Sequence, residues 1–242
     1  MEFYFYKLIY SMNKLLFNFI FLIISITYAQ NYKVTYSFSV NIDADTIKNQ
    51  DKKYFYKNHY AKELDKTFGV LYTNIEGSIF EQEGTMQNTY YSGPFVNERY
   101  TSKKNKTIYK TNSEVLKLHE PYNYRTFTDL DWKISPEKKI INGYTCYKAI
   151  GKVKYFIDKY SYYVEAWFCP EIPLPYGPDI YAGLPGLVFE AYRKDGKELH
   201  WTLKAIEKNK TKTFKIPEIT NALHYEVYDK IYYDAIQKIM KM

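Results

Sequence analysis

The sequence predicts a mainly β protein of the α+β class, built as a curved antiparallel sheet with one apolar face and packed by a C-terminal helix. Two observations predict the sheet: the chain holds many short runs rich in aromatic and β-branched residues, and apolar and polar residues alternate within them. A third predicts the helix, because apolar residues recur every four positions from Leu223 to Ile239.

The N-terminus is typical of a secretory signal peptide, residues 1–29, with Met12 as the expected start. Lys14 supplies positive charge, and the apolar run that follows is shorter than the ~20 residues that span a bilayer. Small residues precede an expected cleavage before Gln30. The sequence therefore predicts export, to the periplasm, the outer membrane or the outside.

The remaining residues, 30–242, predict a single domain without a transmembrane segment. The whole chain carries a net charge of +7, but its lysines are scattered among acids and apolar residues. This pattern favours a solvated surface over a nucleic-acid groove. The two cysteines and four histidines have no metal-ligand spacing, and no cofactor motif is present.

Four stretches in the first half of the domain predict strands, the second of them with a bend inside it: 31–42, 68–83, 105–112 and 122–129. The next stretch has Pro136 and a charged tip, and we expect it to turn between Ile134 and Ile140.

The two cysteines fall on strand-like runs that flank a turn at Asp158 and Lys159. A hairpin turning there places Cys146 directly opposite Cys169, with Cα atoms ~4.5–5.5 Å apart. In an exported chain this predicts a disulfide, and the alternative is two free, buried thiols. Neither cysteine adjoins a histidine or a basic cluster, which disfavours a catalytic role.

A second hairpin follows, with a three-residue loop at 194–196. The pairing we expect places three apolar pairs on one face: Leu187 with Leu203, Phe189 with Trp201, and Ala191 with Leu199. The other face is wetter and carries Glu190, His200, Thr202 and Lys204.

The C-terminal helix should run for about five turns and begin near Thr220 or Asn221. Its broad apolar stripe favours packing on the sheet over lying on a membrane surface.

Before the second hairpin, Leu184-Pro185-Gly186-Leu187 predicts a type II turn in which Gly186 takes a positive φ. The segment leads into a strand and lacks the Gly-Lys-Ser/Thr of a phosphate-binding loop. It also lacks a nucleophile between its glycines.

The stretch "AGLPGLVFEAY" at 182–192 resembles the signature of the GLPGLI family, with Val188 in place of the final isoleucine. The likeness extends to "EAWFCPEIPLPYGP" at 165–178 and "KIINGYTCYKA" at 139–149. The resemblance implies an exported protein of Gram-negative bacteria whose outer membranes are rich in TonB-dependent transporters. It implies no catalytic residues, because the activity of that family is unassigned.

The resemblance marks ten signature residues, whose structural or ligand-binding role stays open: Trp167, Ile172, Pro173, Gly177, Pro178, Gly183, Leu184, Pro185, Gly186 and Leu187. The family often has Gly-Arg in the hairpin before Ala-Trp, and this chain has neither. The resemblance does not imply the disulfide, because Cys169 falls where the family more often has another residue.

Three functions follow from these features. A sheet with one apolar face favours a non-catalytic carrier or binding protein for an apolar, lipid-like ligand. The alternative is an accessory of an outer-membrane, TonB-dependent transport or assembly system that works by protein contact. A hydrolase is the third, but acids such as Glu165 and Glu190 form no recognised pair, so the sequence leans against an enzyme.

Overall fold

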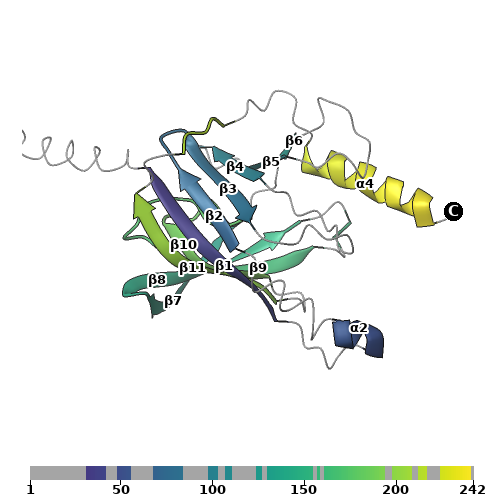
Figure 1. Cartoon of the computed structure of the whole chain (residues 1–242), viewed down its shortest axis with the longest axis horizontal. Helices are drawn as coiled ribbons and strands as arrows, with labels where there is room; N and C mark the ends of the chain where they lie inside the picture. Colours follow the sequence, from purple (N-terminus) through teal and green to yellow (C-terminus); the bar gives the residue numbers. More distant parts are fainter. Residues whose placement is uncertain are drawn as a thin grey trace, which may run out of the picture.

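The computed structural model describes twelve stretches of the chain, shown in Figure 1: residues 31–41, 48–55, 68–83, 98–102, 107–110, 124–126, 130–154, 157–158, 161–193, 198–208, 212–216 and 224–240. The predicted signal peptide lies outside these residues, as do the loop at 194–196 and the helix start near Thr220.

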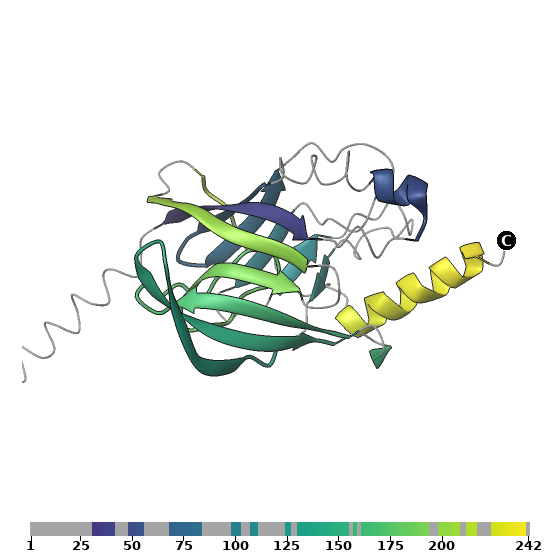
Figure 2. The ribbon, with the colours of Figure 1, turned by 90° about the horizontal axis from the view of Figure 1, so that it is seen from below.

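Within the described residues the chain forms one antiparallel sheet of eleven strands. The strands are β1 (Tyr32–Asn41), β2 (Phe68–Thr73), β3 (Gly77–Glu83), β4 (Glu98–Ser102), β5 (Thr107–Lys110), β6 (Tyr124–Thr126), β7 (Lys133–Ile141), β8 (Tyr144–Val153), β9 (Tyr162–Cys169), β10 (Leu187–Arg193) and β11 (Glu198–Lys208). Their order in the sheet is β6-β5-β4-β3-β2-β1-β11-β10-β9-β8-β7. The sheet curls strongly, which confirms the predicted fold class (Figures 1 and 2).

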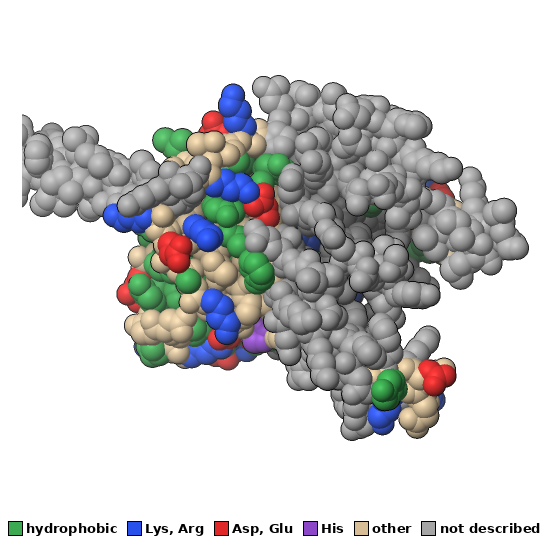
Figure 3. All heavy atoms as spheres, viewed as in Figure 1, with side chains coloured by type: hydrophobic (Ala, Val, Ile, Leu, Met, Phe, Trp, Pro, Cys, Tyr) green, Lys and Arg blue, Asp and Glu red, His purple; other side chains and the backbone are tan. Residues whose placement is uncertain are grey.

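The inner face of the curl holds the apolar core. On β1 it receives Val34, Tyr36 and Phe38, every second residue, as the alternation in the sequence predicts. Phe38 lies opposite Trp201 of β11, and their ring centroids are 4.5 Å apart. On the side seen in Figure 3 the described basic and acidic side chains are interspersed.

The β8–β9 hairpin has the predicted register. Tyr147 lies opposite Phe168, and the next position in the same register places Cys146 opposite Cys169. The predicted disulfide is nevertheless wrong for this structure, because both cysteines are free, buried thiols. Opposed positions bring two thiols close without forcing the S–S geometry that a bond requires.

The predicted turn between Ile134 and Ile140 is also wrong. Strand β7 runs straight through Pro136, and the chain turns instead at Asn142 and Gly143. Proline is tolerated because β7 ends the described sheet and its pairing with β8 shifts between Ile134 and Lys138.

The β10–β11 hairpin differs from the prediction by two residues. Ala191 pairs with Trp201 and not with Leu199, and Glu190 pairs with Thr202. A shift of two keeps most side chains on the predicted faces. A bulge between Val188 and Glu190 changes the face of β10 before it, so Val188 joins the apolar face and Leu187 lies on the other.

Two helices are described: α2 (Gln50–Phe55), which the sequence did not predict, and the predicted C-terminal helix α4 (Tyr225–Met240). Helix α4 packs beside the edge strand β6 and runs outward from the sheet (Figures 1 and 2). Tyr228 is buried, while Val227 and Ile231 stay exposed. Neither helix is long and apolar enough to cross a membrane.

Candidate functional site

The segment between β9 and β10, residues 170–186, carries most of the signature, and we call it the signature segment. Its larger side chains are buried: Tyr176, Ile180, Tyr181 and Leu184 are all at most 8% exposed. Backbone bonds connect it to the start of β10, where Leu187 N–H donates to Ile172 O and Val188 N–H donates to Tyr176 O. The segment is therefore part of the core.

Two contacts hold the signature segment to distant parts of the sheet. The Trp132 indole N–H, just before β7, donates to the carbonyl of Ala182 at 2.9 Å. Arg99 of β4 forms an ion pair with Asp179 at 2.7 Å. Because β4 and β7 lie far apart in strand order, the segment bridges the two halves of the curled sheet.

The predicted type II turn is wrong in its detail. Gly183 has the positive φ, 90°, and Gly186 does not. The Gly186 N–H donates to Leu184 O, which makes a three-residue turn centred on Pro185. Gly186 is required for another reason: a Cβ there would overlap the carbonyl oxygen of Cys169.

The structure separates the ten signature residues into two groups. Buried are Trp167, Gly177, Pro178, Leu184, Gly186 and Leu187. Partly or fully exposed are Ile172, Pro173, Gly183 and Pro185. The signature thus describes mainly how the segment fills the inside of the sheet.

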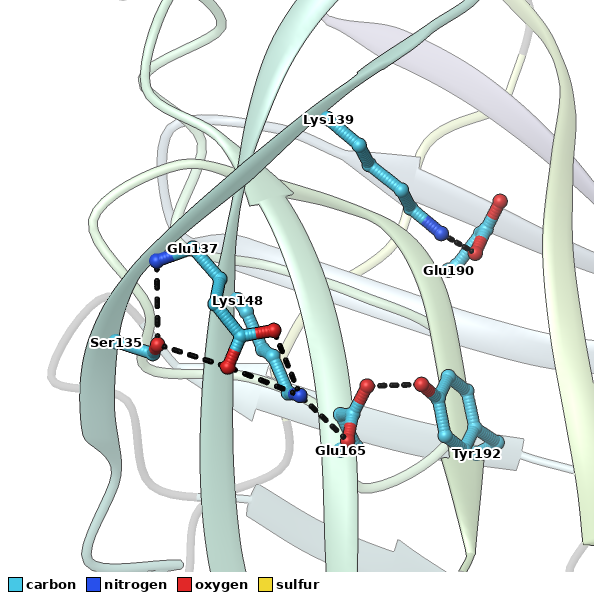
Figure 4. A network of polar contacts seen from close by, with 7 residues as sticks. All are labelled: Ser135, Glu137, Lys139, Lys148, Glu165, Glu190 and Tyr192. Carbon is cyan, nitrogen blue, oxygen red and sulfur yellow. Dashed lines mark hydrogen bonds and ion pairs between the residues drawn. The ribbon is translucent and has the colours of Figure 1, made fainter.

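A polar cluster forms on the opposite face of β8, β9 and β10, and Figure 4 shows its charged side chains with Tyr192. The strand register builds it: Trp167 lies between Lys148 on β8 and Glu190 on β10, and Glu165 lies opposite Tyr192. We use "polar cluster" for these five residues together with Lys139 and Glu137 of β7.

Lysines neutralise the two inner carboxylates of the polar cluster. Lys139 Nζ lies 2.6 Å from Glu190 Oε2 and 4.3 Å above the Trp167 ring. Lys148 Nζ lies 3.5 Å from Glu165 Oε2, and the Glu165 side chain is only 2% exposed.

Glu137 and Tyr192 complete the polar cluster, Glu137 beside Lys148 and Tyr192 beside Glu165. Glu137, on the exposed edge, holds Lys148 Nζ at 3.1 Å, and this hydrogen bond is the main reason that the pKa of Lys148 is raised. The Tyr192 hydroxyl donates to Glu165 Oε1. Burial, followed by this bond, raises the pKa of Tyr192.

In this arrangement three carboxylates and two lysines are linked in ion pairs over the buried Trp167 ring. Sequence reasoning noted Glu165 and Glu190 but missed their lysine partners. The available signal was the spacing of two, Glu165 with Trp167 and Glu190 with Tyr192, which places each pair on one face of its strand. Among the described residues, no group of three or more His, Cys, Asp or Glu side chains could hold a metal ion.

A family model described as "Protein of unknown function (Porph_ging)" matches residues 156–190, which include the signature segment and three members of the polar cluster, Glu165, Trp167 and Glu190. No curated protein matches the chain. Two solved structures are similar, described as PNGF-II in the P21 and C2 space groups, with 18% and 17% identity and a TM-score of 0.47 each. Each match covers 86% of this chain, which spans about a third, 34% and 33%, of those chains.

Proposed function

We propose that this is an exported protein of the cell envelope, cleaved after residue 29, whose single GLPGLI-type domain, residues 30–242, works by protein contact and without catalysis. In this proposal it serves as an accessory of an outer-membrane, TonB-dependent transport or assembly system. The signal-like N-terminus and the signature stretches support the location.

The observation that carries the proposal is the filled interior of the curl. A carrier for an apolar ligand needs apolar space inside the sheet. Here the signature segment lies against that face, with Tyr181 and Leu184 both at most 3% exposed. The protein's own chain thus occupies the place of a lipid-like ligand, so the protein-contact function is favoured over the carrier.

Apolar side chains remain exposed on the β7–β8 hairpin. Ile134 is 53% exposed, Ile140 is 67% exposed, and Tyr144 of β8 is 36% exposed. Exposed large apolar side chains on an edge strand are available for contact with another protein.

The polar cluster offers less support for a hydrolase. A hydrolase needs carboxyl groups that are free to act on a substrate. Lys139 Nζ lies 2.6 Å from Glu190 and Lys148 Nζ lies 3.5 Å from Glu165, so both carboxylates are engaged in ion pairs. The pairs instead connect four strands, β7 with β10 and β8 with β9, and so hold the exposed β7–β8 hairpin in place.

Site-specific photocrosslinking in the native envelope tests the proposal. A photoreactive residue at Ile140 should give a crosslink to one discrete envelope protein. The same residue at Ile75, which is 66% exposed but lies in the β2–β3 turn, is the matched control and should give none.

Native mass spectrometry of the protein, purified from the envelope without detergent, tests whether it carries a bound ligand instead. A bare polypeptide mass agrees with the protein-contact function. A reproducible extra mass removed by organic solvent, with no crosslink at Ile140, would overturn the proposal in favour of the carrier.

A further inference from the structure

Strand β7 is an edge strand whose two halves differ. It ends the described sheet and is paired only with β8 (Figure 2). In the first half Pro136 and a register shift interrupt the pairing with β8. Proline and irregular pairing both protect an edge strand against the addition of another strand. In the second half, residues 138–141, pairing with β8 is unbroken.

The turn defines which backbone groups of the second half are open. Asn142 and Gly143 both have a positive φ, 52° and 84°, as a two-residue type I′ turn requires. The flanking residues, Ile141 and Tyr144, therefore exchange both of their hydrogen bonds. In an antiparallel pair the bonded positions alternate, so Ile140 and Lys138 direct their N–H and C=O groups away from β8.

The side chains at this open edge define the partner. Lys138 and Ile140 share one face of β7, Lys138 is exposed and Ile140 is 67% exposed. On the other face Lys139 is already paired with Glu190, so Lys138 is the lysine that this edge offers to a partner. It repels a lysine of a second copy and attracts an acidic residue.

We propose that the edge of β7 at residues 138–141 binds an extended, acidic segment of a partner protein by adding it to the sheet as an antiparallel strand. The segment presents apolar residues opposite Ile141 and Ile140 and an acidic residue opposite Lys138. This inference rests on the proposed protein-contact function and names the partner's chemistry.

The test uses two synthetic peptides and the full purified protein. The acidic probe, acetyl-Thr-Val-Val-Thr-Glu-Thr-amide, has the order that antiparallel pairing requires, with its glutamate opposite Lys138, and the basic probe has lysine in place of the glutamate. Amide chemical-shift changes in NMR spectra measure binding and its location. We expect the acidic probe to perturb the amides of residues 138–141 and to bind more tightly than the basic probe.

Lys138→Glu tests the charge complementarity. It should weaken the acidic probe about fivefold and strengthen the basic one, because an attractive cross-strand pair becomes a repulsive one. Lys204→Glu makes the same charge change at an exposed site on β11 and should leave both affinities unchanged.

Ile140→Pro tests the backbone bonds. Proline removes the outward N–H at this position and no bond to β8, so the acidic probe should no longer bind. Ile140→Thr keeps the N–H and should retain binding. If the proline variant fails to fold, the Lys138→Glu result decides alone.

Equal binding of the two probes, shift changes away from β7, or an unaltered affinity in Lys138→Glu would each overturn strand addition. These failures differ from failure of the proposed function. A crosslink at Ile140 without acidic-probe binding leaves the protein-contact function standing and removes only this mode of contact.

Discussion

Gly186 lies where the signature segment returns to the end of β9. Any side chain there meets the backbone of Cys169 and Pro170, which are parts of the chain that have little freedom to move. The residue is fixed by this close approach and not by its φ angle.

Gly186→Ala should therefore lower the free energy of unfolding by about 2–4 kcal/mol, because the backbone must separate to make room. Gly183→Ala is the matched control, since a Cβ there meets open space. It should cost about 1 kcal/mol, from the positive φ alone. Urea unfolding measures both, and an equal loss in the two variants would contradict the close-approach explanation.

At the scale of elements, the β8–β9 hairpin places two reduced thiols inside the protein. Burial raises the pKa of Cys146 to about 12, and burial also raises the pKa of Cys169. An unfolded thiol ionises near pH 8.5. The folded state therefore gains stability from these thiols below that pH, and loses it as pH rises toward about 12.

We expect no reaction of either cysteine with a thiol reagent at pH 8 in the folded protein, and reaction of both in urea. The urea midpoint should fall between pH 8 and 11, and less steeply in Cys146→Ala. Protein from the envelope that yields no reactive thiol even in urea would show that a disulfide forms there.

The same hairpin shows what the sequence could predict about elements. The position of one turn was sufficient to obtain the β8–β9 register, because both strands are regular. The β10–β11 register was wrong by two, because it depends on the connection between the strands: a three-residue loop would pair Tyr192 with Glu198, but Tyr192 pairs with His200. The bulge at Val188–Glu190 lies in the pairing with β9 and changes the face of the residues before it. Pro136 predicted a turn that the structure does not have. A strand accepts proline at the edge of a sheet, and the sequence does not show that β7 is an edge strand.

The polar cluster was unpredictable for a related reason. Lys148 and Glu190 flank Trp167 only through two separate strand registers, and the sequence predicted the register with β8 but not the register with β10. Lys139 reaches Glu190 from two strands further along the sheet. Alternation within one strand indicates a shared face, but it does not identify neighbours across the sheet.

At the scale of the whole molecule, the ion pair of Arg99 with Asp179 connects β4 to the signature segment. Arg99→Met should lower the free energy of unfolding by about 2 kcal/mol, less than a fully buried pair would cost, because the Asp179 side chain is 25% exposed. The Asp179→Asn variant and the double variant complete a mutant cycle. Additive losses in that cycle would show that the pair does not couple the two halves of the curl.

The sheet also joins the first and the last strand of the chain's described residues at its centre. Strand β1 lies between β2 and β11, and Tyr32 pairs with Lys208. On synthesis, β1 emerges first, but one of its edges stays open until almost the entire domain has followed. Such distant pairing is slow to form and leaves a long apolar strand available for wrong partners in the meantime. A holding chaperone that shields β1 until β11 arrives should therefore raise the yield of folded protein more than one that acts on the finished chain.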